Sequence, residues 1–278
     1  LAGPGPACGG RRAAATPTLD ARHLVSRATI HVMLLSPPLT APAEFDGVLA
    51  AQGFAVLGAA GATGWLGAPA AEWADWLPFW DRLPPDAYLK DGGRYRRRRH
   101  GCYIVDGDAV TPQPHRAHWQ PVEYNALHGG IERHFEPVEP ALASHPLWNR
   151  WLVLGAARAS ALKGVQPWFV EAHVFRIDTT DGIGRPTPEG AHRDGVDLVS
   201  VTLVSREGVK GAETRVFAAQ GREGQRFTLT EPWSTLWLDD ERVVHESTPI
   251  QPLQPAGAGH RDTLVVTYRA AGFQGPEA

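Results

Sequence analysis

The sequence predicts a mainly β protein with flanking helices, in which the strands of the second half form an antiparallel barrel or sandwich. Three observations lead to this prediction. From Phe169 onward the chain consists of short stretches that alternate apolar and polar residues, separated by segments with Gly and Pro. Before Gly164, three stretches carry apolar side chains at helical spacing. Neither a fixed-period repeat nor a linker interrupts residues 38–273, which indicates a single domain.

The first two helices are predicted within residues 38–83. Residues 38–53 begin with Pro and an acidic first turn and end at Gly53. Residues 54–57 follow as a short strand, and residues 70–83 form the second helix. Its apolar stripe, at positions i, i+3, i+4 and i+7, consists of Trp73, Trp76, Leu77 and Trp80. An aromatic stripe at this spacing is typical of core packing, so we assign it no ligand.

Residues 93–105, GRYRRRRHGCYIV, combine four consecutive arginines with residues that favour a strand. Such a run is usually a solvated face or a phosphate patch, yet the chain is net acidic and the run continues into three strand-forming residues. The alternative is a strand that directs arginines into a pocket. Because strand side chains alternate, at most half of the run points inward. Arg97 and Arg99 share one face of the strand, and Arg96 and Arg98 share the other.

A third helix is predicted at residues 139–162, before a break at Gly164. Its apolar side consists of Leu147, Trp148, Trp151, Leu152 and Leu162. The strands predicted after it cover residues 169–178, 196–205, 214–220, 225–230, 234–240 and 263–270. Several short strands at such spacing indicate an antiparallel barrel or sandwich.

Composition and charge make a small molecule the expected partner. The net charge of -3 gives no electrostatic reason to expect nucleic acid or an anionic membrane. No apolar run approaches the ~18 residues that cross a bilayer, so we expect a cytoplasmic protein without a membrane segment. Cys8 and Cys102 lie far apart, which argues against a disulfide framework and a Cys-rich zinc site. Residues 1–32 show no period, and we expect a disordered N-terminal extension before one domain at 33–278.

His192 and Asp194 form an HxD pair immediately before a predicted strand. Residues i and i+2 of an extended segment project to the same side, so an imidazole and a carboxylate converge on one point. His245 follows in a stretch that indicates a strand and then a turn, and antiparallel folding can bring it opposite the pair. Two histidines and one carboxylate leave three positions of an octahedral ion open, which suits non-haem Fe(II) with a bidentate cosubstrate and oxygen. The sequence therefore predicts metal ligands and a catalytic centre at these three residues.

A second HRD, at residues 260–262, lies too near the C-terminus for a histidine to follow it. Roughly one HxD is expected by chance in a chain with 12 histidines, so only the ordered set is specific. Arg261 could hold the distal carboxylate of a dicarboxylic acid, with Thr263 on the same face adding a hydroxyl. A kinase catalytic loop is rejected, because Val199 stands where its Asn is expected. The histidines to which we assign no role include His23, His118 and His145.

At these motifs the chain resembles the bacterial 2-oxoglutarate/Fe(II) dioxygenases that hydroxylate free or lightly modified amino acids. That family is typified by L-isoleucine hydroxylase and by the related pipecolate and N-succinyl-leucine hydroxylases. The resembling stretches are EYNALHGGIERHFEP (123–137), FVEAHVFRI (169–177), PTPEGAHRDGVDLV (186–199), GAET (211–214), VVHESTPI (243–250) and HRDTLVVTY (260–268). The resemblance implies a double-stranded β-helix core (jelly roll, cupin-like) at about residues 90–272, with the N-terminal helices supporting one sheet.

The resemblance further implies that His192, Asp194 and His245 bind iron and that Arg261 anchors 2-oxoglutarate. In such enzymes O2 decarboxylates the cosubstrate to succinate while an unactivated carbon of the substrate is hydroxylated. Related halogenases lack the carboxylate that Asp194 supplies, so hydroxylation is the expected reaction. An amino-acid substrate needs a cation for its carboxylate, and we expect Arg97 there, because the arginine-rich strand of relatives lines the pocket.

Arg176 and Glu189 are the alternatives for substrate binding, with Glu189 suited to an ammonium group. Each of these charged residues could equally form a structural ion pair. The competing function is a non-redox jelly-roll metalloprotein, either a Zn or Mn hydrolase or isomerase, or a binding module without catalysis. A hydrolase has no need of a dicarboxylate anchor, so Arg261 with Thr263 favours the oxygenase. The sequence leaves the identity of the amino acid and the oligomeric state open.

Overall fold

The computed structural model describes residues 1–3, 5 and 35–276. The chain divides into two units, Leu1–Val32 and Met33–Ala278, and the fold lies in the second. The predicted disordered extension falls almost wholly outside the described residues, as does Cys8. The disorder of residues 1–32 and the absence of a disulfide framework that involves Cys8 therefore stay predictions.

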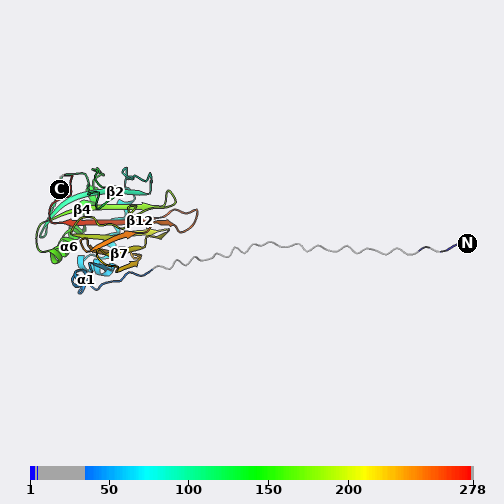
Figure 1. The fold of residues 1–278 in the computed structure, drawn as a ribbon, viewed down its shortest axis with the longest axis horizontal. Coiled ribbons are helices and arrows are strands. Elements are labelled where there is room, and N and C mark those ends of the chain that lie inside the picture. The colour runs from blue at the N-terminus through cyan, green and yellow to red at the C-terminus, as the bar shows by residue number, and fades with distance from the viewer. Residues whose placement is uncertain (4, 6–34, 277–278) are drawn as a thin grey trace. The chain divides into compact units, whose positions relative to one another are not determined.

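A seven-stranded antiparallel sheet, in the order β1-β9-β5-β12-β4-β2-β3, forms the centre of the second unit (Figure 1). Its strands are β1 (Phe54–Leu57), β2 (Arg96–Asp106), β3 (Ala109–Pro112), β4 (Trp168–Asp178), β5 (Leu198–Glu207), β9 (Thr235–Asp239) and β12 (His260–Arg269). Two smaller antiparallel sheets have the orders β10-β7-β8 and β11-β6. Their strands are β6 (Val209–Gly211), β7 (Thr214–Ala218), β8 (Gly224–Phe227), β10 (Val243–Ser247) and β11 (Ile250–Pro252). The predicted mainly β fold with a jelly-roll core is confirmed.

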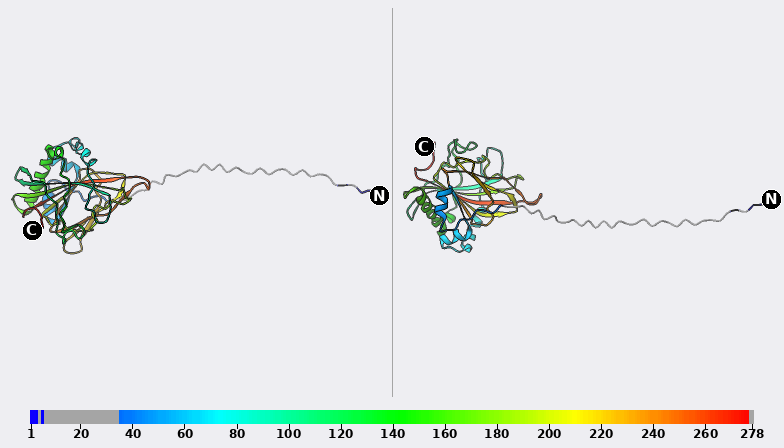
Figure 2. Two further views of the ribbon diagram at one scale, coloured as in Figure 1. Left: turned by 90° about the horizontal axis from the view of Figure 1, so that it is seen from above. Right: turned by 60° about the horizontal axis from the view of Figure 1, so that its bottom comes forward.

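The helices gather on one side of the seven-stranded sheet (Figures 1 and 2). They are α1 (Phe45–Gln52), α2 (Ala59–Leu66), α3 (Ala70–Ala74), α4 (Leu77–Trp80), α5 (Pro140–Ala143) and α6 (Pro146–Lys163). α6 contacts β2, β3 and β12, and α1 contacts β1 and β9. The large side chains buried in this layer include Trp73, Trp76, Trp80, Trp148, Trp151, Trp237 and Tyr268. Burial of each such ring contributes about 2–3 kcal/mol, so this layer supports the sheet from behind.

The helix predictions are confirmed in place and corrected in length. Gly53 ends α1 with φ 79°, and its N–H donates to the carbonyl of Leu49 at 2.9 Å. The helix predicted at residues 70–83 is two short helices, α3 and α4, because Pro78 has no N–H to donate to the carbonyl of Ala74, where α3 ends, and is tolerated only in the first turn of the new helix α4. Leu77 consequently leaves the buried stripe and is 39% exposed. Pro146 divides the helix predicted at 139–162 into α5 and α6 in the same way.

Side-chain alternation gives the main sheet two different faces. On β12, the residues that pack toward the helices are Leu264, Val266 and Tyr268. The alternate residues of β12, which line a cavity on the opposite face, are Arg261, Thr263, Val265 and Thr267. β4 contributes Glu171, His173, Phe175 and Ile177 to the same cavity. A second apolar cluster packs β5 against the smaller sheet through residues that include Val199, Leu203, Val216, Phe227 and Val243, so the smaller sheet covers part of this face.

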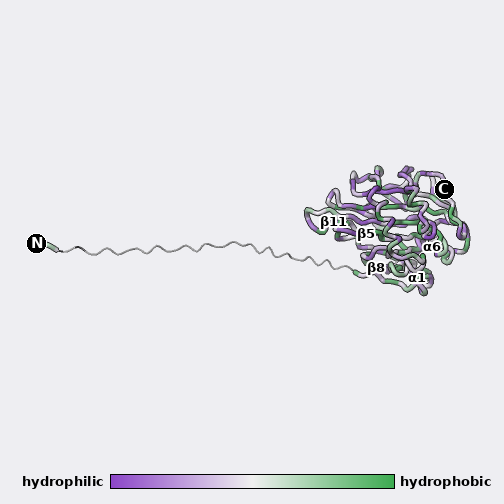
Figure 3. Tube along the Cα trace, turned by 180° about the vertical axis from the view of Figure 1, so that it is seen from behind, coloured by the Kyte–Doolittle hydropathy of each residue, from purple (hydrophilic) through white to green (hydrophobic). Residues whose placement is uncertain are grey.

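The hydropathy of the chain fits this division. In Figure 3 polar and apolar residues are interleaved along the strands. Among the described residues, no helix combines the length and the hydropathy that a membrane span requires.

Candidate active site

The structure brings His192, Asp194 and His245 together in the cavity. The backbone N–H of His192 donates to the carbonyl of His245 at 3.0 Å, and the reverse hydrogen bond is 2.9 Å, so the two histidines lie side by side. The Nε2 atoms of His192 and His245 each lie 3.8 Å from a different carboxylate oxygen of Asp194. The chosen ligand atoms of the three residues all lie within 4.8 Å of one another. Two imidazoles and one carboxylate therefore form one compact donor set.

This donor set fits a divalent iron ion. His192 Nδ1–H donates to the carbonyl of Gly190 at 2.9 Å, which leaves its Nε2 lone pair free on the side of Asp194. Burial lowers the pKa of His245 well below its ordinary value, so its ring is in the neutral form that binds metals. Burial also disfavours a charged His192, but the carboxylates of Asp194 and Glu189 outweigh it and raise its pKa. The space between these side chains therefore favours a positive charge, and its donors, two imidazoles and a carboxylate, suit Fe(II).

Asp240 holds the HxD turn in place. Its carboxylate accepts hydrogen bonds from the backbone N–H groups of Asp194 at 2.9 Å, Gly195 at 2.7 Å and Val196 at 3.1 Å. Gly195 has φ 76°, and a Cβ there would lie 2.5 Å from the ring of Tyr124. The turn therefore requires glycine at position 195, because of the positive φ and because the backbone lies close to the ring of Tyr124.

Arg261 lines the cavity as a buried cation. It is 4% exposed, and its Nε atom has no hydrogen-bond partner among the residues that the structure describes. Its cross-strand neighbour on β5 is another cation, Arg206, which donates to the carbonyl of Gly211 at 2.7 Å. Burial and then the charge of Arg206 lower the pKa of Arg261 to about 10. The carboxylate of Asp262 offsets these two effects only in part, so the buried guanidinium is suited to bind an anion, with Thr263 beside it in the cavity wall.

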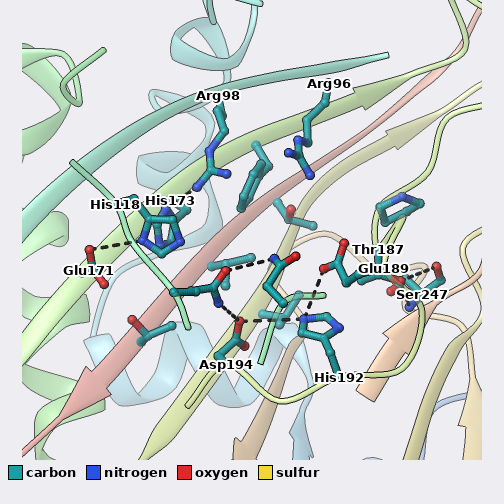
Figure 4. Close-up of a pocket in the computed structure, with 18 of the residues that line it drawn as sticks. Arg96, Arg98, His118, Glu171, His173, Thr187, Glu189, His192, Asp194 and Ser247 are labelled. Carbon is teal, nitrogen blue, oxygen red and sulfur yellow. Dashed lines mark hydrogen bonds and ion pairs between the residues drawn. The ribbon is translucent and has the colours of Figure 1, made fainter. Parts of the chain in front are cut away.

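The arginine-rich strand β2 presents Arg96 and Arg98 to the cavity, and these are 5% and 3% exposed. Figure 4 shows both side chains pointing into the space opposite Asp194 and His192. A third guanidinium, that of Arg133, lines the same cavity and donates to Gln120 Oε1 at 2.9 Å. One wall of the cavity is therefore strongly cationic.

The expectation that Arg97 lines the pocket is corrected. Pairing of β2 with β4 sets Arg98 opposite Phe175, a cavity residue, so Arg97 lies on the other face of the strand. Its side chain is 38% exposed, and its Nε lies 3.4 Å from Asp178.

Of the two alternatives for substrate binding, the structure places Glu189 in the cavity and Arg176 outside it. Arg176 lies on the helix side of β4 and donates two hydrogen bonds of 2.7 Å to Asp262, so it forms a structural ion pair. Glu189 Oε1 lies 3.5 Å from His192 Nε2, and its Oε2 is buried without a hydrogen-bond partner in the described part of the chain. Glu189 is therefore free to accept from a cationic group in the cavity.

Several cavity residues have no role predicted from the sequence. They are Arg96, Arg98, His118, Gln120, Arg133, Glu171 and His173. His118, to which we assigned no role, is 7% exposed and lines the cavity. The alternation of FVEAHVFRI contained the signal for Glu171 and His173, which share a face with Phe175. Residues 113–135 enter through turns and bridges, which give no periodic signal.

Comparison with known proteins gives a consistent result. Residues 77–267 match the 2OG-Fe dioxygenase family. A solved structure of a BsmA homologue from Methylobium petroleophilum PM1 is 51% identical, covers 86% of this chain and 96% of that chain, and has a TM-score of 0.81. IDO from Bacillus thuringiensis (18% identity, 83% and 99% coverage, TM-score 0.68) and the Fe(II)/(alpha)ketoglutarate-dependent dioxygenase TqaL (20% identity, 82% and 86% coverage, TM-score 0.60) share the fold. No functionally curated protein matches the sequence.

Proposed function

The chain belongs to the 2OG-Fe dioxygenase family, and from this premise we propose that it hydroxylates a free or lightly modified amino acid. It is a 2-oxoglutarate-dependent dioxygenase, and its cofactors are Fe(II), 2-oxoglutarate and O2. When Fe(II), 2-oxoglutarate and O2 are bound, they supply the oxidation. One atom of O2 enters the substrate C–H bond, and the other enters the succinate that forms together with CO2. The amino-acid substrate and the role of each residue are the parts that we propose.

His192, Asp194 and His245 are the proposed iron ligands. The observation that supports this assignment is the convergence of their ligand atoms within 4.8 Å in the cavity wall. Asp240 positions this set by accepting three hydrogen bonds from the backbone of the HxD turn. Arg261 is the proposed anchor of the distal 2-oxoglutarate carboxylate, because it is a buried cation in the same cavity.

The charges of the cavity favour a zwitterionic substrate. The guanidiniums that line it belong to Arg96, Arg98, Arg133 and Arg261, and the carboxylates to Glu171, Glu189 and Asp194. Asp86 supplies a fourth carboxylate, 2.7 Å from the Nε of Arg96. Fe(II) and the 2-oxoglutarate dianion compensate each other, so the loaded cavity is balanced before the substrate enters. A zwitterionic amino acid keeps this balance, whereas a dicarboxylate or a diamine leaves a net charge buried.

The proposed function is tested by mixing the anaerobic protein with Fe(II) and 2-oxoglutarate and then adding amino acids with O2. We expect the weak visible absorption band of the Fe(II)–2-oxoglutarate chelate, and succinate release that one group of amino acids or their N-acyl forms stimulates. His245→Ala should lose the band, while His115→Ala, at an exposed histidine, should keep it. A wild-type protein that keeps stoichiometric zinc and forms no band would instead support the non-redox metalloprotein.

A further inference from the structure

A buried polar cluster lies beside the proposed substrate space. It consists of His100, His118, His173 and Glu171, whose exposed fractions are 0%, 7%, 4% and 7%. Glu171 Oε1 accepts from His100 Nε2 at 2.9 Å and lies 3.3 Å from His118 Nδ1. The rings of His100 and His173 stack, with centroids 4.7 Å apart. Figure 4 shows Glu171, His118 and His173 adjoining Arg98 at the cavity wall.

Three buried histidines suggest a second metal site, and the contacts of the cluster argue against one. Arg98 donates from NH2 to His173 Nδ1 at 2.7 Å, so this nitrogen has no lone pair left for a metal, and a cation stands next to it. Glu171 occupies the facing nitrogens of the other two rings. The nearby thiol of Cys102 is no ligand in this state, because burial raises its pKa and keeps it protonated.

The cluster instead fixes one end of Arg98. The guanidinium carbon of Arg98 lies 3.7 Å from the ring centroid of Phe135 and 4.2 Å from that of Phe175, so two aromatic rings set its position. The hydrogen bond to His173 occupies one amino group of Arg98, and its Nε is buried without a partner within residues 35–276. A guanidinium held in this way has little rotational freedom left to lose when it binds a ligand.

The charge of Arg98 is only partly compensated within the protein. Of the carboxylate oxygens that the structure describes, the nearest is Asp86 Oδ2, 4.0 Å from NH1. The same oxygen accepts from Arg96 Nε at 2.7 Å, so one carboxylate serves two guanidiniums. Arg133, a third cation of this wall, binds the neutral Gln120. An anion in the cavity would therefore gain from Arg98 without first breaking a close ion pair.

We propose that Arg98 binds the carboxylate of the substrate and that Glu171, acting through the histidine cluster, is a residue that positions it. This inference rests on the proposed function and adds to it the residue that selects an acid over its amide. Glu171 orients His100 and His118, and the stack of His100 on His173 holds the ring that accepts from Arg98. The ligand class is a small carboxylic acid whose remainder carries an ammonium group.

The test compares Arg98→Met with Arg97→Met, a matched control that removes the same charge from the neighbouring position on the outer face of β2. The probes are the twenty L-amino acids, their N-acetyl forms and the carboxamide of the best of them. For the best acid we expect KM to rise roughly 10- to 100-fold in Arg98→Met and to stay within roughly 2-fold in Arg97→Met. The wild-type preference for the acid over its carboxamide should disappear in Arg98→Met. An equal shift in both variants, or a preserved preference, overturns the proposal.

Two further variants keep the test decisive if Arg98→Met does not fold. Arg98→Lys keeps the charge but loses the planar fork, and it should show the same selective rise in KM with a smaller amplitude. Glu171→Gln keeps the shape of the side chain, and we expect it to raise KM roughly 10-fold with a smaller change in kcat. A fall in kcat alone would assign Glu171 a different role and contradict the positioning proposal.

Metal analysis separates the remaining outcomes. After anaerobic loading with Fe(II), we expect one ion per chain in the wild type and in His173→Phe. Two ions per chain, with one lost in His173→Phe, would make the cluster a metal site and overturn the inference. If the wild-type protein forms no chelate band and its succinate release is not stimulated by any amino acid, both the proposed function and this inference are contradicted. An active wild type in which Arg98→Met behaves like Arg97→Met contradicts this inference alone.

Discussion

Replacement of Arg261 by methionine should have opposite effects on cosubstrate binding and on stability. Arg261 is buried, its Nε has no hydrogen-bond partner among the described residues, and its cross-strand neighbour is the cation Arg206. Methionine has a similar length and fills the same space without a charge. The variant therefore loses the proposed contact with 2-oxoglutarate and, in the absence of the cosubstrate, loses a buried charge that Asp262 compensates only in part.

The two magnitudes follow from the same burial. Truncation of one member of a buried, hydrogen-bonded charge pair costs about 2–5 kcal/mol of binding. This corresponds to a rise of roughly 30- to 4000-fold in the 2-oxoglutarate concentration for half-saturation. Replacement of a poorly compensated buried ion by an apolar side chain is neutral or stabilises by about 1–4 kcal/mol. For a domain of this size each kcal/mol raises Tm by about 2–4 °C.

Titration of the chelate band with 2-oxoglutarate measures the first effect, and thermal unfolding without cosubstrate measures the second. Arg97→Met is the control, because Arg97 is a half-exposed arginine on the other face of the sheet. An unchanged 2-oxoglutarate requirement in Arg261→Met would refute the anchor. A lower Tm in the absence of cosubstrate would refute the claim that this charge is poorly compensated.

Two other predictions concern the scaffold. Gly155→Ala in α6 should lower stability by about 1–3 kcal/mol although alanine favours helices, because its Cβ would lie 1.9 Å from the buried Tyr268 hydroxyl oxygen. Gly64→Ala in α2, where no described atom lies within 4 Å of the added Cβ, should raise Tm instead, and equal shifts in the two variants would disprove the packing argument. Burial raises the pKa of Asp86, but Arg96 and Arg98 outweigh it, so the folded-state pKa lies below that of the unfolded chain. The carboxylate therefore stabilises the fold above pH ~4 and loses this contribution as the pH falls through its folded pKa. The difference in Tm between wild type and Asp86→Asn should consequently narrow below pH ~4. A difference in Tm that does not change with pH would contradict the ion pair.

The parts of the fold that the sequence predicted are those with a local cause. The alternation of apolar and polar residues predicted β4, β5 and β12, and it predicted that Arg261 and Thr263 share one face of β12. Successive side chains of any strand point to opposite faces, so this division can be read from the local sequence. Because His245 follows the HRD at residues 192–194 and no histidine follows the HRD at residues 260–262, the sequence indicated that the first HRD lies beside the second histidine. Pro78 was also local, and its effect on the helix at residues 70–83 could have been predicted from the sequence.

The parts that the sequence could not give depend on pairing over long distances. Alternation divided the four arginines of β2 into two pairs, but only the antiparallel register with β4 decides which pair enters the cavity. That register sets His100 opposite His173 and Arg98 opposite Phe175, so one choice of pairing creates both the histidine stack and the aromatic support of the guanidinium. A shift of one residue would direct Arg97 inward and turn the histidine outward. The cationic wall and the cluster that orients it are therefore a single consequence of strand register, and a register-preserving variant such as Arg98→Met tests them without disturbing the sheet.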